Sequence, residues 1–583
     1  MDYLVVPRCG LCRFDFTENE VITIRRSSPI KNGHYITHPL SELEDDGNSY
    51  PARHPRSRRA GGRRTGYHAD CIRQRDCPSV PRLSDATSYA YGPPPGENAR
   101  RLRWVRSRLA SVIYYAVACR LPYELCDMIA RYGVREYALY ISKKFCQDNT
   151  AAEFRIDVRK PVWARYAFLD GLRYIASLAN KPLWSDAVSL SRPEPDIRVA
   201  YVVEDHLGVR DVRFGGFFYK PPQDHTKPGL WWRTVELLHQ KLVGQTDGTK
   251  LRRLICPSTD PIAPYHIPSM DVLWATLPRC LERFDLLKLM KTYQPVRMMA
   301  LRLDENVTGY SFCWNRCTIA IKAHSDGEDL SVYKNTLPYR PDALWIYIPL
   351  RQGERITEIW LRLHVEAIQS TLVVITSTGR VHFMGAYPIL HQSEFKYRLL
   401  YKADPSHGPF YLDESPAGIQ AVAYMYISNK VENFPPLAPL PHPDCHPSEE
   451  FLYTSACVDN VTHVRLCRAK SSSVITGLVF EYADGHRESV GQTRLDWLGD
   501  AILIDPSEKM WLKFSRYTGR FPRVVDAGFS PISKSMGHTK EYFYIMWHGI
   551  LHWWVSLNQC WLYQDGRESF SENHRRELLL SEW

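Results

Sequence analysis

The spacing of hydrophobic positions separates a stretch with helical periodicity from a longer part with strand patterns. Between about Asn98 and Gln147, apolar residues recur every three or four positions, which places them on one face of a helix. Beyond residue 195, short runs rich in β-branched and aromatic residues are bounded by glycine, proline, aspartate and asparagine, as in strands separated by turns. The pattern therefore predicts helices at the start of the region 98–194 and a large β-rich body over 195–583.

Two segments of the body have distinctive patterns of their own. The sequence DVLWATLPRCLERFDLLKLMKT, at 271–292, predicts a helical interlude. The aromatic segment EYFYIMWHGILHWWVSLNQCWLY, at 541–563, lacks the basic face of a membrane-surface helix. For this second segment we therefore expect a pair of strands that joins the C-terminus to the β body.

Two hairpins are predicted from a similarity within the chain. LVVITSTGRVHFMG (372–385) aligns without a gap with LVFEYADGHRESVG (478–491), and each reads as strand, turn, strand and closing glycine. Gly379 and Gly485 fall in the turns, where a tight hairpin needs a positive φ. Two unrelated hairpins could look this similar, so the alignment predicts hairpins and leaves a structural repeat open.

The expected fold class is α+β and multidomain. A chain of 583 residues is too long for one ordinary hydrophobic core, so we expect roughly two to four domains. Three consecutive prolines in RLSDATSYAYGPPPGE remove backbone donors and stop any helix there. The expected parts are a Cys/His segment with an Arg-rich insertion (1–80), a linker (81–97), a helical region (98–194) and an all-β body of prism or sandwich type (195–583).

The charge of the chain is mildly positive and is concentrated in one stretch. A net charge of +10 over this length does not by itself indicate nucleic-acid binding. Six arginines lie in a Gly/Pro/Ser-containing segment, which fits a nuclear-import or polyanion-binding patch as well as a solvated insertion. They are Arg53, Arg56, Arg58, Arg59, Arg63 and Arg64.

The N-terminus and the cysteines indicate a protein of the reducing cell interior. MDYLVVPRCGLC lacks the basic region and apolar run of a signal peptide, and no apolar stretch is long enough for a membrane span. The 15 cysteines are scattered without a disulfide framework. We therefore expect a protein that is not secreted and is cytoplasmic or nuclear.

Two Cys/His pairs carry the sharpest chemical signal. Cys9-x2-Cys12 and His68-x2-Cys71 each present two metal-binding side chains, and four such ligands with no open position are typical of structural zinc. These pairs resemble the first half of RING, PHD or LIM-like zinc modules. The prediction is a zinc site that folds a segment without a core of its own, and free thiols beside an incidental histidine are the alternative. Further ligand candidates are Cys77, His34, His38 and His54.

A second motif, LPYELCDMIARY, predicts a helix that opens with proline and has a carboxylate in its first turn. It resembles the opening of an F-box, the helical module that docks on the Skp1-type adaptor of ubiquitin-ligase complexes. The later residues REYALYISKKFCQD lack the tryptophan that usually closes that motif, and a generic amphipathic helix fits the same pattern. The residues that match, and would bind the partner, are Leu121, Pro122, Glu124, Leu125 and Ile129.

The order of the parts resembles filamentous-fungal proteins that carry an N-terminal Cys/His knuckle, an LPxEL helix and a β-rich tail, and that are labelled F-box domain-containing. This resemblance implies a non-catalytic adaptor, a substrate receptor of a ubiquitin-ligase complex with an Skp1-like partner and a target. The strand grammar of GERITEIW (353–360) and of both hairpins resembles jacalin-like β-prism lectins, although their sugar-binding loop has no counterpart at the matching position. That second resemblance implies a lectin-like carbohydrate-binding protein.

Signatures of catalysis are not found in the sequence. It contains no GxSxG, no HExxH, no P-loop and no GxGxxG after a strand. Lone histidines in or beside the hairpins, such as His382 and His486, are more often exposed or hydrogen-bonded than catalytic. The expectation is therefore a binding protein without enzymatic activity, whose one cofactor is structural zinc.

Overall fold

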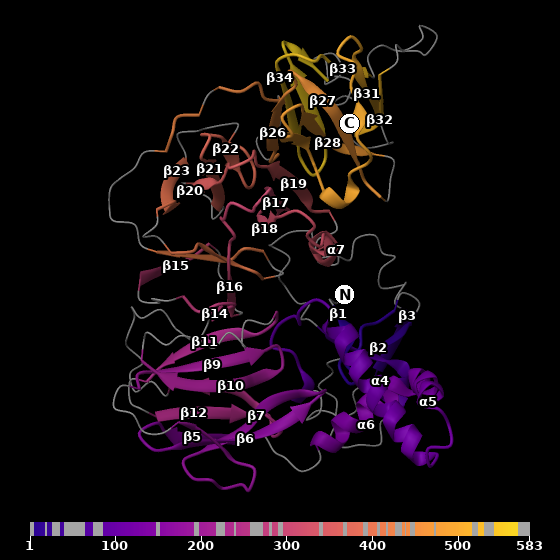
Figure 1. The fold of residues 1–583 in the computed structure, drawn as a ribbon, viewed down its shortest axis with the longest axis vertical. Coiled ribbons are helices and arrows are strands. Elements are labelled where there is room, and N and C mark those ends of the chain that lie inside the picture. The colour runs from indigo at the N-terminus through magenta and orange to yellow at the C-terminus, as the bar shows by residue number, and fades with distance from the viewer. Residues whose placement is uncertain are drawn as a thin grey trace. The chain divides into compact units, whose positions relative to one another are not determined.

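The computed structural model divides the chain after Leu281 into two units, Met1–Leu281 and Glu282–Trp583, and each is described by itself (Figure 1). Strands dominate the described part of both units, which confirms the predicted β-rich character. The structure describes residues 5–17, 20–25, 35–39, 64–73, 86–146, 152–191, 197–216, 228–237, 241–256, 272–278, 283–289, 295–336, 342–364, 370–388, 395–404, 408–415, 418–425, 434–437, 439–443, 449–470, 474–515, 523–529 and 542–569.

The first unit begins with a small sheet that holds both Cys/His pairs. Strand β1 (Val5–Cys9) runs parallel to β4 (Arg64–His68), and β4 is antiparallel to β2 (Val21–Arg25), which pairs with β3 (Tyr35–Pro39). The short helix α2 (Ala69–Arg73) follows β4 directly. Because β1 and β4 are neighbours, the end of one strand and the end of the other bring the two pairs together.

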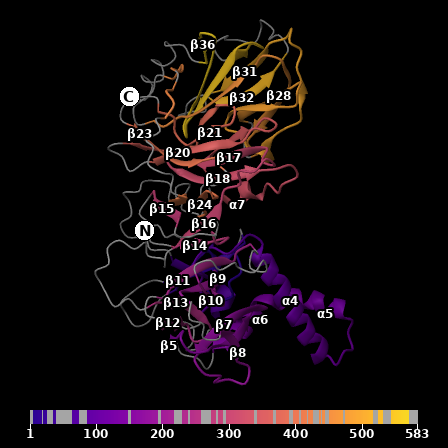
Figure 2. The same ribbon diagram turned by 60° about the vertical axis from the view of Figure 1, so that its left-hand side comes forward.

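Helices follow over the range in which the sequence has helical periodicity. They are α4 (Glu97–Ala116), α5 (Tyr123–Ala130), the 3₁₀ turn η1 (Arg131–Gly133) and α6 (Val134–Cys146). Gly96 precedes α4 with a φ of 80°, a conformation that costs glycine little. Figures 1 and 2 both place α5 on the side of α4 away from the strands of this unit.

Antiparallel strands make up the rest of the first unit. They pair in the orders β7-β6-β8, β13-β12-β5 and β10-β9-β11-β14, and valine, leucine and isoleucine side chains fill the core between them. The strands are β5 (Ala152–Asp157), β6 (Val162–Leu169), β7 (Leu172–Ala179), β8 (Val188–Ser191), β9 (Val199–Asp205), β10 (Gly208–Gly215), β11 (Trp231–Glu236), β12 (Lys241–Thr246), β13 (Leu251–Ile255) and β14 (Val272–Trp274).

The prediction that the helical region extends to residue 194 is wrong, because the strands begin at Ala152. The local cause is the pair Asp170-Gly171, whose φ angles of 52° and 78° form a two-residue turn between β6 and β7. Such a turn matches the twist of an antiparallel pair and favours a hairpin over a helix.

The segment expected to be a linker packs against these strands where it is described. Ala86 is buried, and its carbonyl accepts a hydrogen bond from the buried Lys250 ammonium. The Ala90 N–H donates to the His206 carbonyl, and Arg252 donates to the carbonyl of Ser88. This segment is therefore a packed connection rather than a free linker.

The second unit contains mostly antiparallel strands around one large core. Its pairing orders are β16-β24-β25-β15, β18-β17-β19, β22-β21-β20-β23, β29-β28-β27-β30, β32-β31-β33 and β26-β34-β35-β36. The elements are β15 (Phe284–Lys288), β16 (Val296–Ala300), β17 (Gly309–Trp314), β18 (Thr318–His324), α7 (Ser331–Thr336), β19 (Leu344–Pro349), β20 (Ile356–His364), β21 (Ser370–Thr376), β22 (Val381–Phe383), β23 (Phe395–Lys402), β24 (Tyr411–Asp413), β25 (Ala421–Met425), β26 (Leu452–Cys457), β27 (Val461–Arg468), β28 (Ile475–Tyr482), β29 (Arg487–Gly491), η6 (Leu495–Trp497), β30 (Ile502–Leu503), β31 (Met510–Ser515), β32 (Arg523–Gly528), β33 (Tyr542–Ile545), β34 (Ile550–Val555), β35 (Cys560–Gln564) and β36 (Arg567–Glu568).

Both predicted hairpins are confirmed, with the same register. β21 pairs with β22 and β28 pairs with β29, and the turns contain Gly379 and Gly485 with φ angles of 80° and 84°. The aromatic C-terminal segment forms β33, β34 and β35, as expected for strands. The helical interlude at 271–292 is wrong, because its described residues contain β14 and β15; pairing with neighbouring strands overrides the local spacing of its leucines.

Candidate metal centre

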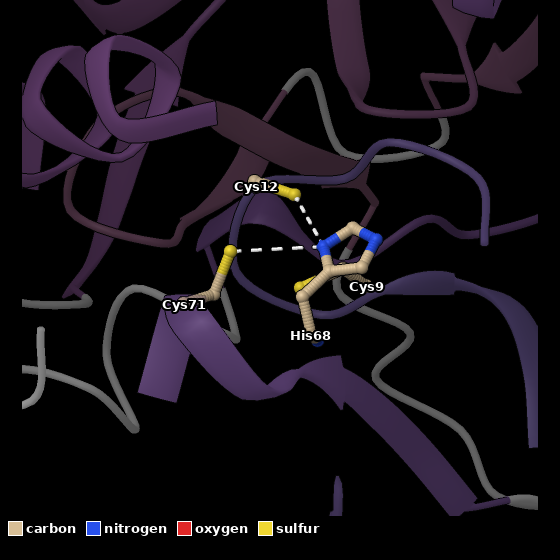
Figure 3. A group of neighbouring side chains, drawn as sticks. All are labelled: Cys9, Cys12, His68 and Cys71. Carbon is tan, nitrogen blue, oxygen red and sulfur yellow. Dashed lines mark hydrogen bonds between the residues drawn. The ribbon is translucent and has the colours of Figure 1, made fainter. Parts of the chain in front are cut away.

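The structure brings Cys9, Cys12, His68 and Cys71 together as one buried group (Figure 3). Their ligand atoms all lie within 4.8 Å of one another. The Nδ1 atom of His68 is 3.2 Å from the sulfur of Cys12 and 3.6 Å from that of Cys71. Tetrahedral zinc, with metal–ligand bonds of about 2.0–2.3 Å, places its ligand atoms at similar separations. The group could therefore hold a metal ion.

A tight backbone turn positions Cys9 and Cys12. At the end of β1, the Arg13 N–H donates to the Cys9 carbonyl at 2.9 Å, and the Cys9 N–H donates to the Phe14 carbonyl at 3.0 Å. Arg13 closes this turn with a positive φ of 64°. The His68 N–H points at the sulfur of Cys9 at 3.5 Å, as a donor to a thiolate would. These backbone contacts position Cys9 and Cys12 without the help of a metal ion.

The protonation of the thiols supports the same interpretation. Burial alone would raise the pKa of Cys9, but hydrogen bonds from Cys12, Cys71 and His68 outweigh it and lower that pKa. Burial raises the pKa of Cys12, and hydrogen bonds with the other two thiols raise that of Cys71. The three thiols therefore interact strongly, and they cannot all ionise easily on their own. Three thiolates in this space need a cation between them, and a metal ion supplies that charge.

A carboxylate lies close to the second ring nitrogen of His68. The Nε2 atom of His68 lies 3.3 Å from Oε2 of Glu20, and Glu20 also pairs with Arg135 of α6. If Nδ1 faces the metal, Nε2 carries the proton and faces this carboxylate. A carboxylate at this position favours the tautomer of a metal-binding imidazole in which Nδ1 is free to bind the metal.

A buried cluster of charges connects the Cys/His group to the helices and to the β6–β7 turn. One oxygen of Asp170 accepts hydrogen bonds from Arg13 at 2.6 Å and from Arg101 of α4 at 2.7 Å. Arg101 also donates to the carbonyl of Cys12. Burial opposes ionisation of Asp170, but the two guanidinium groups outweigh it and lower its pKa to about 2.

The charges of this cluster complement those of a metal site. Two arginines against one aspartate leave an excess of one positive charge, and Arg13 and Arg101 keep guanidinium nitrogens that are buried without a hydrogen-bond partner in the described residues. A divalent cation held by three thiolates and a neutral histidine carries one net negative charge. The residues present therefore fit a Cys₃His metal site in charge as well as in geometry.

The structure does not describe the side chains of the remaining metal-ligand candidates or of the arginine run. Cys77, His34 and His54 fall outside the described residues, as do the arginines from Arg53 to Arg63. His38 belongs to β3 and Arg64 to β4, but nothing is described of their side chains.

The F-box-like residues lie on α5 and directly before it. Pro122 caps the helix, which begins at Tyr123, and Leu121 is partly buried. Glu124, Leu125 and Ile129 are exposed, whereas Cys126 and Ala130 form the buried face.

Glu20, Arg101, Arg135 and Asp170 were not found by sequence reasoning. Asp170-Gly171 did carry a turn signal, but nothing local links it to a cysteine 158 residues earlier (Cys12 to Asp170). A scan against protein-family models gives no match, and a search among curated proteins gives no significant match either. Among the described helices, none combines the length and the apolar character needed to cross a membrane.

Proposed function

We propose that this chain is a non-catalytic adaptor in which a zinc-bound head supports a helical module that binds an Skp1-type protein, while the β-rich body holds a target. The observation that carries the proposal is the concentration of exposed apolar side chains on the helices. Of the 18 large hydrophobic residues that are exposed in the described chain, nine lie between Leu102 and Tyr140. Exposed apolar side chains gathered on neighbouring helices are typical of protein-binding surfaces.

The exposed residues of α5 and η1 follow helical spacing. Met128 and Ile129 follow Leu125 by three and four residues, and Tyr132 follows them by four and three. Between 43% and 90% of each of the four is accessible to solvent. A helix that presents such a stripe away from its own core is suited to a groove or to another helix. All four lie in the F-box-like motif, and two of them, Leu125 and Ile129, are among the residues that match the F-box pattern.

The remaining contacts of α5 hold it in place from the opposite side. Asp127 pairs with Arg106 of α4, and the Tyr123 hydroxyl donates to the Ser107 carbonyl at 3.2 Å. Cys126 and Ala130 are fully buried. The exposed stripe is therefore presented on a fixed support, so its ordering costs little when a partner binds.

The Cys/His group packs against α4 and α6, the helices on either side of α5 in the sequence. Cys9, Cys12 and Cys71 share one small core with Val105 of α4 and with residues of α6, Val134, Ala138 and Leu139 among them. Zinc is the ion that best suits three thiolates and one imidazole, because it accepts soft ligands in a tetrahedron and needs no open position. Its role here would be to fold the head that carries the docking helices.

The test is binding of purified Skp1 to the full chain, with Leu125→Glu and Ile129→Glu combined. Both residues are exposed, so the double variant should keep its fold. Charges placed in the stripe should weaken binding by at least about a hundredfold, as expected for two interface anchors. Isothermal titration calorimetry measures the affinity, and circular dichroism checks the fold.

The control changes two apolar residues on the strand side of the same unit that are even more exposed than Leu125 and Ile129, Phe168→Glu with Leu183→Glu. This control should bind Skp1 as the original chain does. If the original chain does not bind Skp1, or if both double variants bind alike, the adaptor proposal is wrong.

A further inference from the structure

A proline-rich segment of the second unit, FPPLAPLPHP at 434–443, packs on the surface of the β-rich body, and we call it the strap. Its described residues form neither helix nor strand. Buried or half-buried side chains recur at every third position, which is the repeat of a polyproline II helix, and prolines favour that helix by fixing φ at about −65°. The positions at this spacing are Phe434, Leu437, Leu440 and Pro443; of the other described positions Pro441 is half-buried, and Pro435, Pro436, Pro439 and His442 are exposed.

The first part of the strap packs on aromatic side chains of the sheet β22-β21-β20-β23. Phe434 stacks on Tyr397 of β23, with ring centroids 4.0 Å apart and ring planes at 8°, and meets Trp360 of β20 edge to face at 5.4 Å. Leu437 packs in the same cluster. Trp360 points away from the large core, because side chains alternate along a strand and its neighbour Leu361 belongs to that core. The strap therefore covers the aromatic face of this sheet that is turned away from the core.

The second part of the strap packs on aromatic side chains of β34 and β35. Leu440 shares a cluster with Trp554 and Trp561. The indole N–H of Trp554 donates to the carbonyl of Pro441 at 3.0 Å. Tyr387 packs with this cluster and with the first one, so the rings form one continuous surface, which we call the aromatic track. Its members are Trp360, Phe383, Tyr387, Tyr397, Trp554 and Trp561.

These contacts are of the kind by which proteins recognise proline-rich segments. A polyproline II helix has no internal hydrogen bonds, so its carbonyls stay available to donors such as an indole N–H. Its side chains dock in grooves lined by aromatic rings. With the strap in place, Trp360 and Trp554 are 1% and 0% exposed. The aromatic track therefore has both the composition and the occupant of a polyproline-binding surface.

The strap is attached to the body in a way that another segment can reproduce. Five of its ten residues are proline, which lacks an N–H, so the strap cannot pair as a strand along its length. Among the described residues, a single hydrogen bond, from Trp554 to Pro441, joins the body to the strap. The rest of the attachment is apolar packing, chiefly of Phe434, Leu437 and Leu440. A segment of another chain with apolar residues at the same spacing can make the same contacts.

We propose that the aromatic track is a binding site for proline-rich protein segments, which the chain's own strap occupies until a partner's segment replaces it. The ligand carries apolar side chains at every third position and prolines between them. Aspartate and glutamate are excluded from the apolar positions, because aromatic rings cannot replace the water around a carboxylate. Every residue of the site lies in the second unit, so the inference does not depend on the adaptor proposal or on the metal.

The experiment releases the strap and offers the same segment as a separate peptide. Phe434→Asp with Leu440→Asp places charges at two half-buried positions of the strap and leaves the aromatic track intact; we call this full-length double variant the released variant. A fluorescent peptide FPPLAPLPHP, followed by fluorescence anisotropy, should bind the released variant saturably. The original chain should bind it about tenfold more weakly, because a tethered segment competes at an effective concentration of about 1 mM, ten times a peptide Kd of about 0.1 mM.

The matched control peptide, PPFLLAPPHP, has the same composition, but its three large apolar residues are adjacent. It should bind the released variant at least about tenfold more weakly, since two of its three apolar anchors cannot reach their places. Absence of saturable binding of FPPLAPLPHP to the folded released variant would overturn the proposal, as would equal binding of the two peptides. Equal binding of FPPLAPLPHP to the original chain and to the released variant would overturn it as well, because the strap would then not occupy the site.

Two tryptophan substitutions, each added to the released variant, locate the binding. Trp554→Phe keeps an aromatic ring and removes the N–H that donates to Pro441, which should weaken peptide binding by about fivefold, the value of one hydrogen bond. Its control is Trp547→Phe in the same unit, where the indole N–H donates to the carbonyl of Glu508, outside the aromatic track. The control should bind the peptide as the released variant does, and equal affinities after the two substitutions would contradict the assignment.

A milder release covers the case in which the released variant does not fold. Phe434→Ala removes the stacking on Tyr397 without adding a charge, and it should raise the affinity for the peptide about threefold over that of the original chain. Circular dichroism checks the fold of each variant. Unchanged affinity in Phe434→Ala together with a misfolded released variant counts against the aromatic track as the binding site.

Discussion

The N-terminal head and the second unit are held together by different means. In the head, the buried apolar cluster is small and is made partly of the cysteines themselves, while charged groups bridge its elements. In the second unit, one cluster of apolar residues extends from Leu301 to Leu562. Because the head has few apolar contacts, its stability depends mainly on metal ligands and ion pairs. The stability of the second unit depends mainly on the burial of apolar surface.

This difference predicts which substitutions should destabilise each region most. A structure held by a few specific contacts loses most of its stability when one contact is removed. A large core loses a limited amount for each side chain, because the neighbouring side chains stay packed. The predictions below test that contrast.

Removal of one metal ligand should have the largest effect. Cys71→Ser should abolish stoichiometric zinc binding and unfold the head, because zinc binding in small domains contributes on the order of 10 kcal/mol to folding. Elemental analysis measures the zinc, and hydrogen exchange over residues 5–17 and 64–73 measures the folding. Cys119→Ser, at an exposed cysteine, is the control and should change neither. Full zinc content in Cys71→Ser would refute the assignment of the ligands.

Neutralising the buried carboxylate should have the next largest effect. Asp170→Asn keeps a residue that tolerates the positive φ but leaves Arg13 and Arg101 without their counter-ion, at a cost of about 3–5 kcal/mol. Since the folded state lowers the pKa of Asp170 to about 2, its contribution is complete above pH 4 and is lost as the pH falls toward 2. Urea unfolding of the first unit between pH 2 and pH 5 should show a smaller pH dependence in the variant, and an equal dependence in both proteins would contradict this role.

A core truncation in the second unit should cost less and should stay local. Leu478 is fully buried in the large cluster, so Leu478→Ala should destabilise that unit by about 2–4 kcal/mol. Leu503→Ala, at a residue that is 72% exposed, should change stability by less than about 0.5 kcal/mol. Thermal unfolding followed by hydrogen exchange separates the two units. A loss of zinc from Leu478→Ala would show that the two regions are not independent.

The smallest effect is expected at the hairpin turns. Gly379→Ala and Gly485→Ala should each cost about 1 kcal/mol, because both positions have positive φ and open space around the added methyl group. Equal losses of stability in the two variants would show that the two hairpin turns are equivalent. Gly499→Ala, in the same unit without a positive φ, serves as the control and should cost clearly less.

Local signals in the sequence were sufficient for some features of the molecule. The Cys/His pairs could be found because metal ligands at this spacing follow from local geometry, and the helices from Glu97 to Cys146 follow from apolar periodicity. The hairpin turns at Gly379 and Gly485 were predictable because a tight turn needs a positive φ, which favours glycine, and glycine can be recognised in the sequence.

Other features depend on contacts far apart in the chain. Asp170 could not be assigned, because its partners Arg13 and Arg101 lie in other elements and ordinary surface arginines have the same local surroundings. The strands from Ala152 onward and those at 271–292 were mistaken for helix, since pairing with distant strands decided their state. The aromatic track of the second unit escaped notice for the same reason, as its rings meet only after folding.

The parallel pairing of β1 with β4 has a consequence for biosynthesis. Cys9 and Cys12 leave the ribosome before their partners, because His68 and Cys71 follow 56 and 59 residues after Cys12, and Asp170 follows later still. Synthesis proceeds at roughly 5–20 residues per second, so the first pair of thiols waits for several seconds before the head can close. The Cys/His group is therefore completed late, and the exposed thiols of the nascent chain depend on the reducing conditions around it during that interval.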